Sequence, residues 1–240
     1  INHFFFLLSF LIILSCNSDD DATPIDETKI ENQKPLGTSA SDLLSDNTYT
    51  SITIEIAYNS GYRPTQATLD DFKTFIEDRV NKPDGITFVE TEINSPFVES
   101  QTIQDIKDIE NEQREYYTVL DDIAVFIYFT GAKASSDTET TITLGTAYLN
   151  TSLVVYEKTL RDVSVQQNVD IYLLEETTLQ HELVHLFGLV NIQEDDIHSE
   201  HEDLAHKKHC IVESCLMYYQ SNISSSFRNM VNVPLLDPLC

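Results

Sequence analysis

The segment HELVH, residues 181–185, is the part of the chain whose residue types and spacing could do chemistry. Its two histidines lie four residues apart, so on an α-helix both imidazoles face one side and can reach one metal ion. Neutral imidazole suits zinc, zinc lowers the pKa of bound water, and a carboxylate can accept the proton that this water loses. The sequence therefore predicts that His181 and His185 bind zinc and that Glu182 is the general base. The alternative is a surface helix with incidental histidines.

The residues that follow resemble the metzincin metallopeptidases, and in particular the archaemetzincins. HELVHLFG, residues 181–188, is similar to the metzincin core HExxHxxG, in which the third zinc ligand normally follows the glycine by three residues. That position is Asn191 here, and a neutral amide is a poor zinc ligand beside imidazole. The run from His209 to Met217 is similar to the archaemetzincin run HCxxxxCxM. This resemblance implies that His209 is the third ligand, that Met217 forms the turn beneath the metal, and that residues 189–207 are an inserted loop.

Other side chains in the inserted loop are rival ligands for the metal. They are His198, His201 and His206, together with Glu200 and Glu202 if the site resembles that of the two-histidine-plus-glutamate peptidases. The same loop could hold a second ion or be merely solvated. Met217 could equally be an ordinary core residue.

Two further features of these families bear on the C-terminal part of the chain. Tyr219 stands two positions beyond Met217, where astacin-like metzincins keep a tyrosine that supports the tetrahedral intermediate, so the resemblance implies a catalytic role for Tyr219. Archaemetzincins also carry a closing C-x-x-C for a second, structural zinc. Leu235 and Pro238 occupy roughly those places here, which argues against a second zinc bound by cysteines.

The N-terminus begins with an apolar run, residues 4–14, that is too short to span a bilayer comfortably and ends in Ser15 and Cys16. Such a run is typical of an export signal, although a buried segment is the alternative. Ile13 to Cys16 resembles a bacterial lipobox, in which the chain is cut before the cysteine and the cysteine is lipidated. We therefore expect a signal peptide over residues 1–15 and an acidic, flexible tether over residues 16–47.

The expected location is the bacterial cell envelope, with a lipid anchor in the outer membrane. The acidic residues 19–21 resemble a signal that sends some Gram-negative lipoproteins to the cell surface, but a solvated linker explains them as well. The chain has 14 basic and 40 acidic residues, a net charge of −26, which disfavours nucleic acid and anionic membrane surfaces as partners. We expect a monomer that acts on a peptide or protein and meets the membrane only through its lipid.

If Cys16 is lipidated, three cysteines remain, and they can pair in three ways that each leave one thiol free. These are Cys210, Cys215 and Cys240.

The elements that must position these residues follow from hydrophobic periodicity. Residues 48–240 are long enough for one α+β domain, which the resemblance makes a metzincin-like twisted mixed sheet with an active-site helix and a small irregular C-terminal subdomain. The nearly continuous apolar run 121–129 should be a central strand. The metzincin resemblance implies an antiparallel edge strand that binds extended substrate, for which 141–149 is the candidate, although Gly145 could instead simply mark a bulge. Strands are expected at 50–58, 85–93, 121–129, 141–149 and 152–160, and helices at 67–82, 101–117 and 170–187, with a short helix near 225–231.

These observations lead to a zinc-dependent endopeptidase in which Glu182 activates a metal-bound water. The competing hypothesis is a non-catalytic, zinc-binding surface lipoprotein, suggested by Asn191 and the long insertion. A third is a metal-dependent hydrolase that acts on something other than peptide.

Overall fold

The computed structural model describes residues 27–96, 98–194, 199–219 and 230–240. The predicted signal peptide, Cys16 and His198 lie outside the described residues, as does most of the short helix expected near 225–231. Within the described part of the chain, no helix is both long enough and apolar enough to cross a membrane.

A five-stranded mixed sheet forms the centre of the domain, with the strand order β2-β1-β4-β7-β6. Neighbouring strands run parallel, except that β6 is antiparallel to β7 and forms one edge of the sheet. The central position predicted for the run 121–129 and the edge position predicted for 141–149 are both confirmed. The strands are β1 (Ser51–Asn59), β2 (Gly85–Ile93), β4 (Asp122–Phe129), β6 (Gly145–Leu149) and β7 (Ser152–Val155), and β3 (Ser100–Gln101) pairs separately with β5 (Lys133–Ala134).

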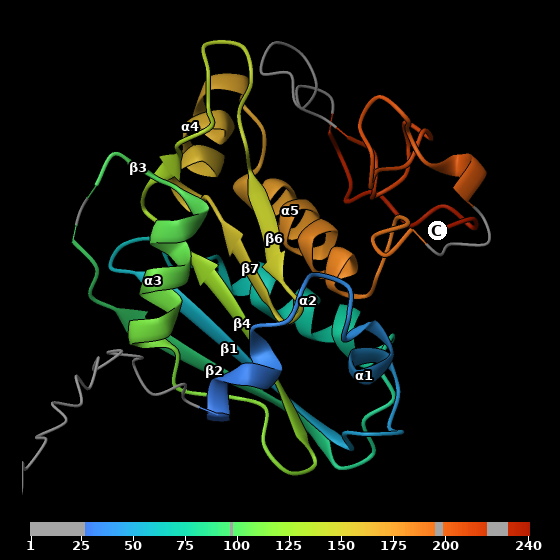
Figure 1. Cartoon of the computed structure of the whole chain (residues 1–240). Helices are drawn as coiled ribbons and strands as arrows, with labels where there is room; N and C mark the ends of the chain where they lie inside the picture. The colour runs from blue at the N-terminus through green and yellow to red at the C-terminus, as the bar shows by residue number, and fades with distance from the viewer. Residues whose placement is uncertain (1–26, 97, 195–198, 220–229) are drawn as a thin grey trace, which may run out of the picture.

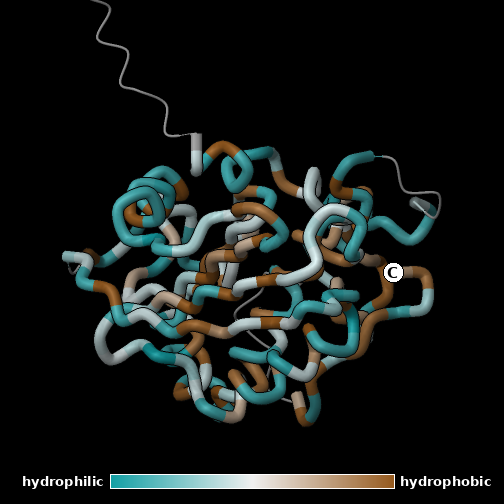
Figure 2. Tube along the Cα trace, turned by 90° about the horizontal axis from the view of Figure 1, so that it is seen from below, coloured by the Kyte–Doolittle hydropathy of each residue, from teal (hydrophilic) through white to brown (hydrophobic). Residues whose placement is uncertain are grey.

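Helices cover both faces of this sheet (Figure 1). α2 (Gln66–Glu77), α4 (Glu157–Gln167) and α5 (Ile171–Leu186) enclose the larger hydrophobic core, which includes Phe72, Leu160 and Leu183. α3 (Ile103–Gln113) covers the opposite face and buries Ile106 against a smaller core. Seen from below, many of the hydrophobic residues lie along the central strands, and most of the outer loops and helices carry hydrophilic residues (Figure 2). The α+β class with a twisted mixed sheet is therefore confirmed.

Helix α4 corrects the prediction of a strand over residues 152–160. The strand β7 ends at Val155, and a helix begins at Glu157. The β-branched residues of this segment favour a strand locally, but burial of Leu160 and Val163 against the sheet decides for a helix.

The N-terminal segment also differs from its prediction. Residues 27–47, expected to be part of a flexible tether, form a 3-10 helix, η1 (Glu27–Asn32), and a short helix, α1 (Ala40–Leu44). Leu43 is fully buried in the larger core, and the side-chain amide of Asn32 donates to Ala124 O at 2.9 Å. A few apolar contacts and buried polar contacts hold this acidic segment on the domain, which composition alone did not reveal.

The described residues after Gly188 contain little regular structure, as expected for a small irregular C-terminal subdomain. A single 3-10 turn, η2 (Ser199–His201), and isolated β-bridges such as Cys210 with Tyr218 organise them. The segment lies beside α5, on the side away from the sheet (Figure 1).

Candidate metal centre

Helix α5 carries the HELVH segment and has well-defined ends. Its N-cap residue Asp170 accepts a hydrogen bond from Tyr172 N, and Gly188 adopts the left-handed conformation, with a φ of +93°, just beyond the C-cap. This is the helix-ending role predicted for the glycine. Buried side chains lie all round the helix, because the C-terminal segment, including Leu216 and Met217, packs on the side away from the sheet.

The structure brings three predicted ligands together: His181 and His185 of α5, and His209 from beyond the inserted loop. Their ligand atoms all lie within 4.8 Å of one another. The ring centroids of His181 and His185 are 4.8 Å apart, and each lies 5.2 Å from that of His209. The long insertion therefore returns the chain to the helix at the residue that the archaemetzincin resemblance implied.

The described residues that were rival ligands contact other side chains instead. Asn191 donates from its side chain to Glu202 Oε2 at 2.8 Å, and His206 pairs with Asp203 at 2.8 Å. Neither these residues nor Glu200 joins the three-histidine group. His201 belongs to a different group, described below.

Each of the three histidines is oriented by a backbone carbonyl. A carbonyl oxygen only accepts, so in the neutral ring the proton sits on Nδ1 and the lone pair of Nε2 is left for a metal ion. This is the arrangement in which proteins present imidazole to metals, and it fits a zinc ion well. The pairs are His181 Nδ1 with Leu216 O at 2.8 Å, His185 Nδ1 with Leu189 O at 2.6 Å, and His209 Nδ1 with Lys207 O at 3.0 Å.

Burial also keeps the three imidazoles neutral. It lowers the pKa of His181 to about 4, and it moves the pKa of His185 well below its ordinary value. Burial lowers the pKa of His209 as well. At neutral pH all three rings are therefore in the uncharged form that binds a metal ion.

The side chain of Glu182 reaches from α5 to the edge strand β6. Its Oε2 accepts a hydrogen bond of 2.8 Å from Ala147 N, and burial raises its pKa to about 8. A Cβ atom on Gly145 would lie 2.6 Å from Glu182 Cγ, so only glycine allows this close approach. The bulge of β6 lies between Ala147 and Leu149, and not at Gly145.

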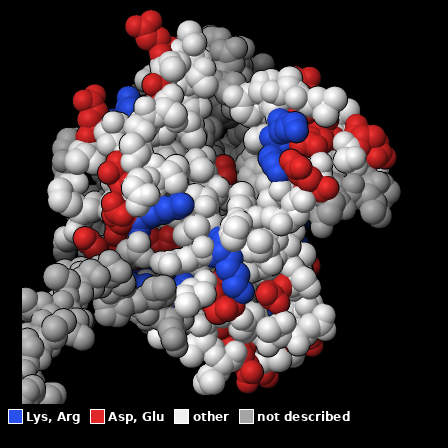
Figure 3. Space-filling view, in the orientation of Figure 1, with Lys and Arg blue, Asp and Glu red and all other residues white. Residues whose placement is uncertain are grey.

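A cavity of about 380 Å³ opens beside these residues and is lined mainly by apolar atoms. Figure 3 shows a hollow between the body of the domain and the C-terminal segment, with acidic side chains spread over this face of the molecule. Leu36, from the segment expected to be a tether, also lines the cavity, and nothing in its polar sequence surroundings signals this.

The other predicted site residues lie close to the three histidines. Tyr219 lines the same cavity, with its ring centroid 5.2 Å from that of His209. Met217 is fully buried, one residue after Leu216, whose carbonyl orients His181.

A second candidate metal group lies in the C-terminal segment. Ligand atoms of His201, Cys210 and Cys240 lie within 4.8 Å of one another, and Cys215 Sγ is 3.4 Å from Cys240 Sγ. This separation exceeds the roughly 2.05 Å of a disulfide, and Cys210, Cys215 and Cys240 are free thiols. The missing C-x-x-C had argued against a second zinc bound by cysteines. Sequence spacing could not reveal that Cys240 and His201 come close together in the fold.

The comparisons with known proteins agree with the fold. Neither a protein-family profile nor a curated protein matches this sequence. Among solved structures, the chain is similar to archaemetzincin from Methanopyrus kandleri, with a TM-score of 0.51 and 16% sequence identity over 79% of this chain and 91% of that one. The likeness supports the archaemetzincin fold predicted from the HExxHxxG and HCxxxxCxM runs.

Proposed function

We propose that this chain is a zinc-dependent peptidase. The observation that carries the proposal is the set of three neutral, carbonyl-oriented imidazoles, His181, His185 and His209, beside the buried carboxylate of Glu182. Three histidine ligands with one coordination position left open are typical of catalytic zinc sites. The zinc would be held through the three Nε2 atoms, and when bound it supplies the acidity that makes water a nucleophile near neutral pH.

Glu182 is the general base of the proposed reaction. One of its oxygens is held by Ala147 N–H, so the other can accept the proton of the attacking water and then donate it to the amine that leaves. The new bond joins the water oxygen to the carbonyl carbon, and the peptide C–N bond breaks. Burial raises the pKa of Glu182 to about 8, although the hydrogen bond from Ala147 N lowers it, so a nearby cation is needed to keep this carboxylate ionised at neutral pH.

The edge strand β6 is the proposed platform for the substrate. Its side away from β7 carries backbone groups to which an extended peptide can add as a further strand. Tyr219 lines the cavity beside His209, where its hydroxyl would donate to the oxyanion of the tetrahedral intermediate. An apolar lining favours a substrate with bulky hydrophobic side chains.

The second group would bind a structural zinc ion. One imidazole and three thiolates are a common donor set for structural zinc, and these four come from residues 201 to 240. Such an ion would tie together the segment that carries His209 and Leu216. We therefore expect two zinc ions per chain. Export and lipid anchoring at Cys16 remain a separate proposal, which labelling with a radioactive fatty acid before and after Cys16→Ala would test.

The experiment that tests the function compares the wild-type chain with Glu182→Gln. Purified wild type should contain zinc and cleave members of a diverse peptide library. The variant should keep its zinc and lose hydrolysis by about 1,000-fold or more, because the base is gone while the ligands remain. Zinc-loaded wild type that cuts no peptide would instead support the non-catalytic lipoprotein.

A further inference from the structure

Tyr148 occupies an unusual place in the edge strand β6. In the pairing of β6 with β7, Ala147 lies opposite Leu153 and Leu149 lies opposite Ser152, so Tyr148 is the extra residue of a β-bulge. An extra residue of this kind has no partner in the ladder, and bulges re-aim the backbone next to it. The ladder pairs Ala147 and Leu149, but it does not determine how Tyr148 between them is placed.

The side chain of Tyr148 supplies a contact that the ladder lacks. Its hydroxyl donates to Glu110 Oε2 of α3 at 2.8 Å, and Glu110 is buried, with 5% of its surface exposed. The other oxygen of Glu110 accepts from Ser152 Oγ of β7 at 2.6 Å. The bulge is thus tied to both α3 and the neighbouring strand.

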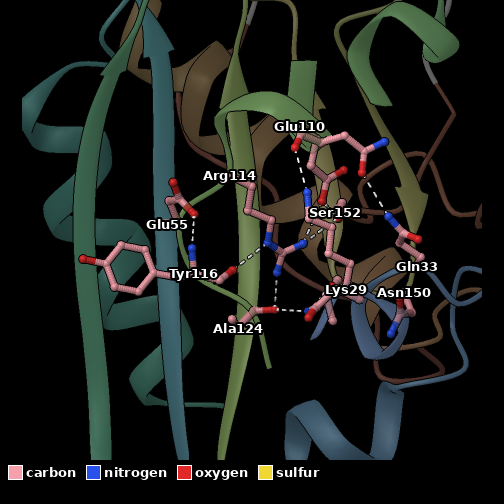
Figure 4. Close-up of polar contacts among 12 residues, drawn as sticks. Lys29, Gln33, Glu55, Glu110, Arg114, Tyr116, Ala124, Asn150 and Ser152 are labelled. Atoms are coloured by element: carbon pink, nitrogen blue, oxygen red, sulfur yellow. Dashed lines mark hydrogen bonds and ion pairs between the residues drawn. The ribbon is translucent and has the colours of Figure 1, made fainter. Parts of the chain in front are cut away.

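Arg114 holds this acceptor in place from the C-terminal end of α3. Its Nη1 lies 2.7 Å from Glu110 Oε1, and its side chain is fully buried. The remaining guanidinium nitrogens donate to the backbone, at 2.7 Å to Tyr116 O and 2.8 Å to Ala124 O. Figure 4 shows Arg114 surrounded by these partners. A buried charge with all these contacts made is a rigid anchor, because loss of any partner leaves a charge or a donor unsatisfied.

The two neighbours Ala147 and Tyr148 face opposite sides of the sheet. Ala147 packs with the larger core beside α5, whereas Tyr148 packs with the smaller core beneath α3. On the α5 side, Ala147 N donates to Glu182. Two adjacent residues of β6 therefore connect the buried anchor on one face with the carboxylate on the other.

We propose that Tyr148 is a positioning residue: its hydrogen bond to Glu110 fixes the bulge of β6 and thereby holds the Ala147 N–H on Glu182. This inference rests on the proposed peptidase function for its catalytic consequence, but the mechanical link does not require turnover. Without the tie, the bulge can shift, Ala147 N–H moves away from Glu182, and the base loses the contact that orients it.

The test is Tyr148→Phe in the zinc-loaded, full-length chain, which removes one hydroxyl and keeps the ring. Tyr128→Phe is the matched control, since Tyr128 is a buried tyrosine on the same face whose hydroxyl donates to Asn59 Oδ1 at 2.8 Å, but it lies on the central strand β4. Both variants lose one hydroxyl, so a general loss of stability affects both.

Two readouts separate positioning from stability. Deuterium uptake of a peptide that covers residues 145–149 should become about tenfold faster in Tyr148→Phe and stay unchanged in Tyr128→Phe. With a cleaved peptide, kcat should fall about tenfold in Tyr148→Phe only, with KM and zinc content within twofold of the wild type.

Unchanged uptake at β6, or equal effects of the two variants, would overturn the proposal. If zinc-loaded wild type cleaves no peptide, the proposed function fails. In that case deuterium uptake alone still decides whether Tyr148 fixes the bulge.

Discussion

Helix α5 and the C-terminal segment that follows Gly188 supply the same candidate metal centre in different ways. The helix contributes His181 and His185 by its own geometry, because residues four apart share a face. The C-terminal segment contributes His209 and the carbonyl of Leu216 without regular structure, held by loop contacts and the cysteine cluster. Two of the three predicted ligands are thus placed by local spacing, and the third is placed by tertiary packing.

Removing His209, the ligand from the C-terminal segment, should have the largest effect on zinc binding and hydrolysis. His209→Ala should lose the zinc of the three-histidine centre and about 1,000-fold or more of peptide hydrolysis, because two imidazoles bind zinc far more weakly than three. His206→Ala is the matched control, a histidine of the same segment outside the group, and should keep its zinc. Equal zinc content in the two variants would remove His209 from the centre. Elemental analysis of the purified proteins decides.

Breaking the cysteine cluster should act on the C-terminal segment alone. Cys215→Ser should reduce bound zinc from two ions to one and lower the melting temperature by about 10 °C, since a structural ion that stabilises only the folded state is lost. Calorimetry and elemental analysis provide the check. Retention of two zinc ions would show that Cys215 is not a ligand.

Adding one methyl group at Gly145 tests the close contact between β6 and Glu182 of α5. Gly145→Ala places a Cβ 2.6 Å from Glu182 Cγ and 2.8 Å from Thr178 Cγ2, so β6 or Glu182 must move. We expect kcat/KM to fall about tenfold with zinc content unchanged, because the base moves while the ligands stay. A fully active variant would mean that the contact between β6 and Glu182 is not needed.

A substitution in a buried pair of acids, one on α4 and one on α5, should give the smallest effect. Glu157 and Glu175 are fully buried, and burial, followed by the charge of Glu175, raises the pKa of Glu157 to about 9. Between the ordinary value of 4.5 and about 9, the folded chain keeps a proton that the unfolded chain loses, so stability should fall as pH rises. Glu175→Gln removes the neighbouring charge.

The melting temperature of Glu175→Gln, measured from pH 5 to pH 9, should therefore exceed that of the wild type by a few degrees at the alkaline end, with little difference at pH 5. Glu77→Gln, at an exposed position of α2, should show no such trend. A pH-independent difference would contradict the assignment of a retained proton to Glu157.

The same contrast explains how much the sequence could predict. Alternation and helical spacing located β1, α2, β2, β4 and α5, and the metzincin resemblance indicated the edge position of β6. They failed at α4, where β-branched residues suggested a strand, and at residues 27–47, where a few buried side chains hold an acidic segment. Contacts such as that of Tyr148 with Glu110 join residues 38 positions apart, and no local pattern encodes them.

The most direct test is a crystal structure of the zinc-soaked protein with anomalous scattering recorded at the zinc edge. We expect one anomalous peak about 2.1 Å from Nε2 of each of His181, His185 and His209, within reach of Glu182, and a second peak at His201 and the cysteine cluster. The absence of a peak between the three histidines would contradict the proposed zinc centre.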